Sequence, residues 1–164
     1  MLNKPDKKAK LKIAGLLSLI SRNRNNRDAC LMLAAELARI NRYDHAIKYF
    51  QKANDIREDY ISLYNIGSLY YKKGEYKKAI LALEKSKQRK PDYIMSSLVT
   101  GLSYSRLNNL KAAVSNFINV LMIDPSNKTA LAALSIIYHN SGRLSDSYRL
   151  MKRLSDKYPA DEKI

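Results

Sequence analysis

Tryptophan is absent from this sequence of 164 residues, and cysteine occurs once, at Cys30. A single cysteine excludes an intrachain disulfide and favours a reducing compartment. Because Cys30 stands beside Leu31 and Leu33, we expect a buried and unreactive thiol. No stretch reaches the roughly 18 consecutive apolar residues that span a bilayer. A chain of this length buries a sizeable core without a metal or a disulfide. From the single cysteine and the lack of a spanning segment, we expect a cytoplasmic protein, peripheral to a membrane at most.

Motifs that carry chemistry are also missing. The two histidines, His45 and His139, lie far apart, and neither has cysteine or carboxylate neighbours at metal-ligand spacing. No glycine-rich phosphate loop and no nucleophile motif occurs in the sequence. The sequence therefore predicts no catalytic residue, no metal site and no cofactor, and it indicates a protein that is not an enzyme.

Proline is scarce, with four residues, but three of these prolines are evenly spaced. Pro91, Pro125 and Pro159 lie 34 residues apart, and Gly101 follows Gly67 by the same interval. A further copy begins at residue 27; it is one residue shorter and lacks the proline. Four consecutive copies of one period indicate a repeat array.

Each copy reads as two helices joined by a tight break. The residue types at the break accept the left-handed backbone conformation that ends a helix. The proline then ends the second helix, because it lacks the amide hydrogen and clashes with the preceding turn. The predicted breaks are Asn41, Gly74, Asn108 and Gly142.

Small residues mark the predicted contact between the two helices of a copy. Gly67 of a first helix should approach Ala79 of its second helix closely, and Gly101 should approach Ala113 in the same way. A bulky residue of the second helix should fill the space beside this contact. These filler residues are Phe50, Leu83, Phe117 and Met151.

This pattern resembles the tetratricopeptide repeat family, whose 34-residue repeat carries Leu-Gly, Tyr, Ala, an aromatic residue and Pro at fixed places. The match is fullest in residues 60–127 and extends from residue 27 to about residue 161. The resemblance implies an all-α solenoid, a right-handed superhelix of about four helix-turn-helix repeats. The repeats would span residues 27–59, 60–93, 94–127 and 128–161, with a C-terminal tail over 162–164.

Residues 1–26 form a basic arm ahead of the repeats. Ile13, Leu16, Leu17 and Ile20 recur at helical spacing, which predicts an amphipathic helix over about residues 7–21. We expect this helix to cap the first repeat. Two alternatives stay open: a helix that binds a membrane surface or a partner, and an atypical export signal, since lysines precede a short apolar run.

By the same resemblance, the first helix of each pair lines a concave groove. The residues that line this groove are apolar and aromatic at its centre and basic at one edge. This pattern favours binding of an amphipathic helix or an apolar peptide of a partner protein. The family's carboxylate clamp is not expected, because only Asn65 matches its residue types. Two alternatives stay open: several of these residues pack against neighbouring helices, or the N-terminal helix of the same chain or of a second copy, as in a homo-oligomer, fills the groove. The predicted groove residues are Leu31, Ala35, Arg39, Ile61, Tyr64, Asn65, Tyr71, Lys72, Met95, Leu98, Leu102, Arg106 and Ile136.

The net charge of +15 at pH 7 is concentrated in residues 1–27 and 60–93. It predicts an anion-binding patch on the convex side, which would attract an acidic protein, anionic headgroups or nucleic acid. Nucleic acid is the weakest of these candidates, because no aromatic side chains alternate with the lysines to stack on bases. A lysine-rich composition that serves solubility alone is the other interpretation. The patch residues are Lys77, Lys78, Lys85, Lys87, Arg89 and Lys90.

The sequence thus predicts a non-catalytic scaffold or adaptor that binds a segment of a partner protein in an apolar groove. Two other functions fit the same features. One is a chaperone-like factor for secretion or assembly, and the other is a basic module that binds an acidic surface through its lysines.

Overall fold

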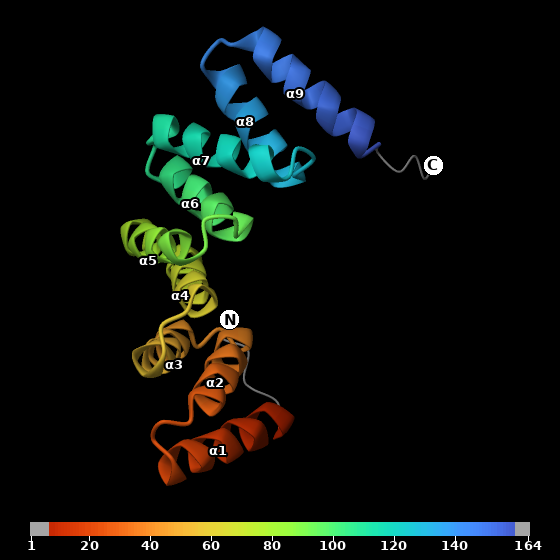
Figure 1. Ribbon diagram of the computed structural model, residues 1–164. Coiled ribbons are helices and arrows are strands. Elements are labelled where there is room, and N and C mark those ends of the chain that lie inside the picture. Colours follow the sequence, from red (N-terminus) through yellow and green to blue (C-terminus); the bar gives the residue numbers. More distant parts are fainter. Residues whose placement is uncertain (1–6, 160–164) are drawn as a thin grey trace. The chain divides into compact units, whose positions relative to one another are not determined.

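The computed structural model describes residues 7–159, and its regular structure in that range is helical (Figure 1). The chain divides into two compact units, unit 1 (Met1–Lys90) and unit 2 (Pro91–Ile164). The predicted tail over 162–164 lies outside the described residues. The helices in residues 7–159 are α1 (Lys7–Arg22), α2 (Arg27–Arg39), α3 (Tyr43–Ile56), α4 (Tyr60–Lys72), α5 (Tyr76–Arg89), α6 (Ile94–Arg106), α7 (Leu110–Ile123), α8 (Lys128–Asn140) and α9 (Leu144–Lys157).

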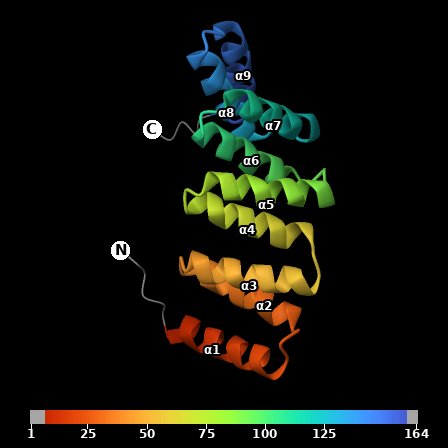
Figure 2. The ribbon, with the colours of Figure 1, turned by 90° about the vertical axis from the view of Figure 1, so that its left-hand side faces the viewer.

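In unit 1, each helix packs against the one that follows it, from α1 to α5 (Figure 2). Leu16 and Ile20 of α1 are buried in a core that also contains Leu33 of α2 and Phe50 of α3. Leu17, which the periodicity assigned to the same face, is exposed instead. The N-terminal helix is therefore packed on α2, through a narrower apolar stripe than the sequence suggested.

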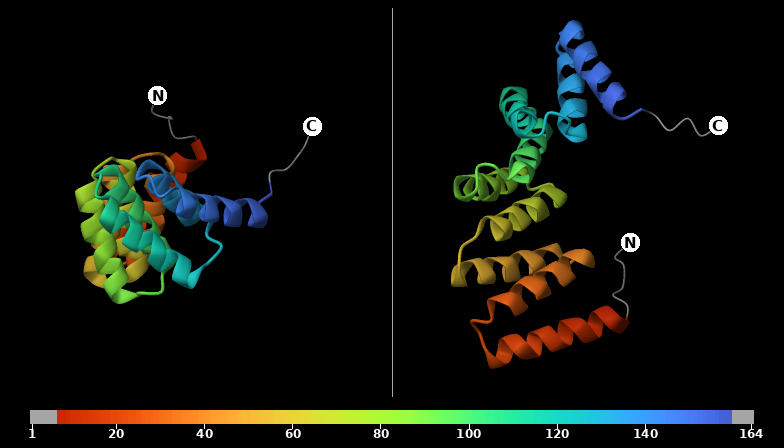
Figure 3. Two further views of the ribbon diagram at one scale, coloured as in Figure 1. Left: turned by 90° about the horizontal axis from the view of Figure 1, so that it is seen from above. Right: turned by 45° about the vertical axis from the view of Figure 1, so that its right-hand side comes forward.

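Unit 2 repeats this arrangement with four helices, α6 to α9. Its core joins Leu98 of α6, Phe117 and Val120 of α7, and Leu134 of α8. The right-hand view in Figure 3 shows α8 and α9 running side by side in opposite directions. Each of the four predicted repeat segments thus contains one helix pair.

All four predicted breaks have the left-handed backbone conformation. The φ angles are 60° at Asn41, 78° at Gly74, 57° at Asn108 and 76° at Gly142. After each break, an amide donates back into the preceding helix; the Arg42 amide, for example, donates to the Leu37 carbonyl at 2.9 Å. This is the hydrogen-bond pattern of a glycine-type helix end. The prediction of these four positions is confirmed.

The close contact between the helices of a pair is also confirmed. A Cβ atom added to Gly67 would lie 2.5 Å from Leu83 Cγ and 3.1 Å from the Ala79 carbonyl oxygen. One added to Gly101 would lie 2.8 Å from a ring carbon of Phe117. Leu83 and Phe117 are fully buried, so the space above each glycine is filled by the bulky residue that the sequence predicted.

The fourth pair departs from this scheme, and the prediction for Met151 is wrong. Its side chain is 56% exposed, whereas Phe50, Leu83 and Phe117 are buried. The glycine place holds Ser135, and the hydroxyl of the buried Ser147 donates to the Ser135 carbonyl oxygen at 2.9 Å. Within residues 7–159 no helix follows α9, and Ser147 is the one buried residue of α9, so Met151 lies on a side of the helix that no neighbour covers.

Hydrogen bonds hold the joint between α3 and α4, where the repeat proline is missing. Asp59 caps α4 by accepting the amides of Ile61 (2.8 Å) and Ser62 (3.0 Å). Arg27 of α2 forms an ion pair with Asp59 and donates to the Arg57 carbonyl oxygen at 3.3 Å. These side chains therefore fix a turn that proline restricts in the later copies.

Alanine substitutions at two glycines of unit 1 should have opposite effects. Gly67→Ala should lower the free energy of unfolding by about 1–3 kcal/mol, because the new methyl group overlaps Leu83 and a backbone carbonyl. Gly15→Ala should raise it by about 0.5–1 kcal/mol, since Gly15 lies in α1 with no atom within 4 Å of an added Cβ. Urea denaturation followed by circular dichroism measures both. Equal effects at the two sites would contradict the proposed close contact.

Candidate binding surfaces

The predicted groove residues on α4 lie on the face of that helix away from its core side chains. We call this set the α4 face: Ile61, Tyr64, Asn65, Tyr71 and Lys72. Ile61 is 47% exposed, Lys72 is exposed, and the other three are half-buried. The Tyr71 ring packs against the Tyr76 ring of α5, with centroids 5.5 Å apart, which restricts its orientation. The face is therefore apolar and aromatic, with a cation at the C-terminal end of the helix.

The predicted groove residues on α2 have mixed surroundings. Leu31 is half-buried and packs against the core of unit 1, and Ala35 is exposed. Arg39 is exposed, but its guanidinium binds the Glu36 carboxylate, with Nη2 at 2.7 Å and Nε at 3.1 Å. Arg39 is therefore engaged within its own helix.

Glu36 is a carboxylate that is only 8% exposed, and two cations neutralise it. Besides Arg39, Lys12 of α1 donates to it at 3.1 Å. The hydrogen bonds from Arg39 and Lys12 lower the pKa of Glu36 against the opposing effect of burial. A cavity of about 390 Å³ opens here between α1 and α2, and Lys8 also lines it. The ion pair thus anchors α1 on α2.

The predicted groove residues of unit 2 are less uniformly exposed. Leu98 is 7% exposed and belongs to the core of the unit, so its side chain is not part of an open surface. Met95 and Leu102 are half-buried against that core, while Arg106 and Ile136 are exposed. Ile136 lines a cavity of about 320 Å³ between α8 and α9, together with His139, Asn140 and Met151.

The basic residues of α5 are largely paired with groups of the chain itself. Lys78 binds Glu75 at 2.7 Å, Lys87 binds Glu84 at 3.0 Å and Arg89 binds Glu58 at 2.7 Å. The ammonium of Lys90 lies 5.3 Å from the centre of the Tyr60 ring. Within residues 7–159, Lys77 and Lys85 are exposed and form no ion pair. The predicted patch therefore offers less unpaired charge than the count of lysines and arginines suggests.

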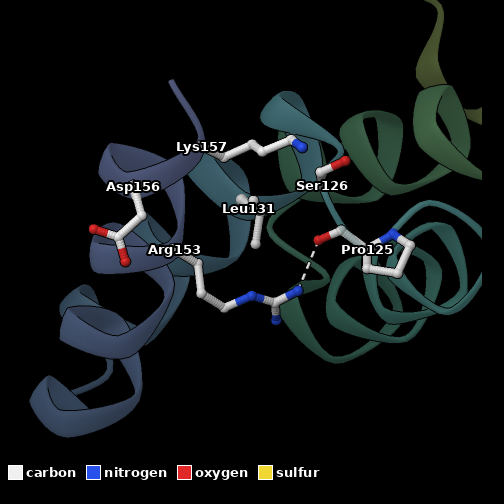
Figure 4. Close-up of a pocket in the computed structure, with 6 residues that line it drawn as sticks. All are labelled: Pro125, Ser126, Leu131, Arg153, Asp156 and Lys157. Atoms are coloured by element: carbon white, nitrogen blue, oxygen red, sulfur yellow. Dashed lines mark hydrogen bonds between the residues drawn. The ribbon is translucent and has the colours of Figure 1, made fainter. Parts of the chain in front are cut away.

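Some cations near the ends of second helices brace the joint that precedes their own repeat. Figure 4 shows Arg153 of α9 donating to the Pro125 carbonyl oxygen, at 2.7 Å. This contact lies in a cavity of about 330 Å³ that is also lined by Asp156 and Lys157. In unit 1, Arg89 near the end of α5 forms an ion pair with Glu58, in the joint before α4. Because the cavity carries both signs of charge, it has no simple anion-binding character.

Sequence reasoning missed several outward apolar side chains, among them Leu81 on α5 and Met122 on α7, which are 67% and 77% exposed. Alignment of the four copies contains the signal. At the place of Met122, the other second helices carry Asp55, Gln88 and Asp156. An apolar residue where the other copies are polar marks a surface that folding alone does not require.

The described residues add no chemistry to this picture. Cys30 is fully buried, and this burial raises the pKa of its thiol. In the range 7–159, no three side chains of His, Cys, Asp or Glu gather as metal ligands. The helices described here are also too short or too polar for any of them to traverse a bilayer.

Comparisons with known proteins agree on the fold. Two family models, both described as tetratricopeptide repeat, match residues 28–60 and 60–93. The crystal structure of MamA covers 94% of this chain and 95% of its own at 20% identity, with a TM-score of 0.85. That of YrrB, described as a tetratricopeptide repeat protein with an unusual peptide-binding site, covers 94% of this chain and 80% of its own at 17% identity, with a TM-score of 0.81.

A curated relative is the uncharacterized protein ycf37 of Guillardia theta, 32% identical over 108 residues, which are 62% of this chain and 59% of that protein. The first curated relatives are longer, and the match covers between 10% and 59% of their length.

The chain is a tetratricopeptide repeat protein. Its helices, packed in sequential pairs, form a solenoid that fits about four repeats plus one further helix. Such repeats generally serve as protein-protein interaction modules, and the fold is typically non-catalytic.

The Glu36 ion pair predicts a pH-dependent contribution to stability. Glu36→Gln should lower the free energy of unfolding at pH 7 by about 1–2 kcal/mol, because an amide cannot pair with both cations. The lowered pKa means that this contribution is complete above the ordinary value of 4.5 and is lost as the pH falls through the lower folded-state value.

Urea denaturation at pH 7 and pH 3 measures this effect in wild type and variant. The difference between them should shrink in acid. Glu84→Gln, at a more exposed pair with Lys87, is the control and should have little effect at either pH. A difference for Glu36→Gln that is the same at both pH values would contradict the assignment.

Proposed function

We propose that this protein is a non-catalytic adaptor that binds a peptide or helical segment of a partner protein through the α4 face. The observation that carries the proposal is the side chain set of α4. Leu63, Ile66 and Leu69 are buried, yet the opposite side of the helix also carries apolar and aromatic residues rather than the polar residues of a solvated surface. Ile61 alone leaves about half of its surface accessible.

The chemistry of the α4 face suits a short protein segment. Tyr64 and Tyr71 offer large, rigid contact areas with few rotatable bonds, a property of residues that dominate interface energies. The Asn65 amide has both a donor and an acceptor for a peptide backbone. Lys72 would meet an acidic side chain at the end of the segment. We include Leu31 and Ala35 of α2 as predicted contacts.

In unit 2, taken by itself, Met95, Leu102, Arg106 and Ile136 remain predicted contacts for a protein segment. We leave Leu98 out because its side chain is buried. The peptide-binding description of YrrB, a protein with the same fold, supports peptide binding as the mode of recognition. The ion pairs of α5 argue against the lysine patch as the principal site, because those charges are already partly compensated.

Tyr64→Glu should weaken the binding of the partner protein. The change places a charge in the centre of the α4 face, so we expect at least a tenfold loss of affinity. Affinity capture from native extract, with nuclease present, compares wild type with the variant after circular dichroism has shown that both are folded. The captured protein is then identified, and its binding segment is remade as a peptide for calorimetry. Tyr148→Glu, at an exposed tyrosine of α9, is the matched control.

The salt dependence of binding distinguishes this proposal from the alternative, a basic module that binds through the lysines of α5. Binding through the α4 face should persist at 0.5 M salt, whereas binding through the lysines of α5 should weaken steeply. If the same partner stays with Tyr64→Glu and is lost only at high salt, the α4 face is not the binding site and the basic module is the better explanation.

A further inference from the structure

A second recess lies in unit 1, between α3 and α5, and α4 forms its floor. Its volume is about 290 Å³. The floor consists of Leu63, Ile66 and Tyr70, whose spacing of three and four residues puts them on one side of α4. This is the side away from Ile61 and Tyr64 of the α4 face. We call this recess the α3–α5 groove.

The α5 edge of the groove combines apolar and basic side chains. Lys78, Leu81 and Lys85 all line it, and their spacing of three and four residues aligns them along one side of the helix. Leu81 is 67% exposed. An exposed leucine therefore stands between two lysines, one helical turn away on either side.

Folding does not require a leucine at this place. The equivalent residues of the other three copies are Lys48, Ser115 and Arg149, as expected for an outward position. The two flanking lysines do not recur together either: His45, Ala112 and Asp146 stand in the place of Lys78. The stripe of lysine, leucine and lysine is thus peculiar to the second copy, which suggests a role beyond packing.

The charges around the groove are asymmetric. On the α5 edge, Lys78 binds Glu75 at 2.7 Å and lies 5.6 Å from the centre of the Tyr70 ring, and Lys85 forms no ion pair within residues 7–159. The α3 edge carries Gln51, Asn54 and Asp55. An occupant with acidic side chains on one flank would therefore meet favourable charge along α5, chiefly at Lys85, because Glu75 already compensates part of the charge of Lys78.

We propose that the α3–α5 groove binds a second protein segment, an amphipathic peptide with an aliphatic anchor for Leu81 and the floor, and with Asp or Glu one turn to either side of that anchor. This surface is separate from the α4 face, so the protein would hold two segments at once. The role is that of a bridging adaptor, and it does not depend on which segment the α4 face prefers.

Selection from a displayed library of random 16-residue peptides tests the groove with the full chain as bait. Peptides that also bind Leu81→Ser are removed in a depletion step. This substitution introduces the residue found at the equivalent Ser115, so we expect the variant to fold, which circular dichroism checks. The remaining peptides should pair aliphatic residues with Asp or Glu at helical spacing.

One such peptide, made synthetically, should bind at least tenfold more weakly to Leu81→Ser and to Lys85→Glu. It should bind Arg149→Ser, the same outward place in the last copy, as tightly as wild type. Binding to Tyr64→Glu should also be unchanged, which separates this site from the α4 face.

Several outcomes would overturn the proposal: no enrichment, peptides without acidic residues, or equal binding to wild type and Leu81→Ser. Sedimentation of the free protein tests whether a second copy of the chain occupies the groove. If wild type is dimeric and Leu81→Ser is monomeric, a second copy of the chain fills the groove and the proposed peptide partner is wrong.

Discussion

The close approach of two helices at Gly67 and Ala79 is the contact on which the rest of unit 1 depends. No side chain separates the helices at Gly67, so Leu83 fills the space directly above it. This fixes the rotation of α4 about its axis and hence the directions in which its remaining side chains point. One side of α4 then forms the floor of the α3–α5 groove, and another presents Tyr64 and its neighbours. The orientation of both candidate surfaces therefore depends on the absence of a side chain at Gly67.

Much of the fold was predictable because it depends on local rules and on period. A left-handed residue must end each first helix, and only Gly or Asn serves well there, so Asn41 and Gly142 could be placed from the sequence. The buried position of Leu98 could not be predicted from the sequence, because it depends on how α6 packs in unit 2. Arg89 and Glu58 are 31 residues apart, and their contact follows from the pairing of helices rather than from spacing along one helix. The groove beside Leu81 does not follow from the features that the copies share, because Leu81 stands at a place where the second copy differs from the others.

Part of the large positive charge of the chain serves contacts within the protein itself. Lys12 holds α1 on α2, Arg27 fixes the entry to α4, and Arg153 supports the loop before α8. These cations act as braces between segments that are distant in sequence. The charge that remains for recognition is local, and Lys85 beside an exposed leucine is an example of how a basic residue gains selectivity from its apolar neighbour.

The joint between α3 and α4 differs in kind from those that contain proline. A proline restricts the unfolded chain as much as the folded one, and added salt leaves that restriction unchanged. Arg27 and Asp59 attract each other only when the turn is formed, and ions in solution weaken that attraction. The turn between the first helix pair and the second is thus held in part by an ion pair whose strength depends on ionic strength. In concentrated salt, amide hydrogens at the start of α4 would exchange with solvent sooner, while the entry to α8, after Pro125, would keep its protection.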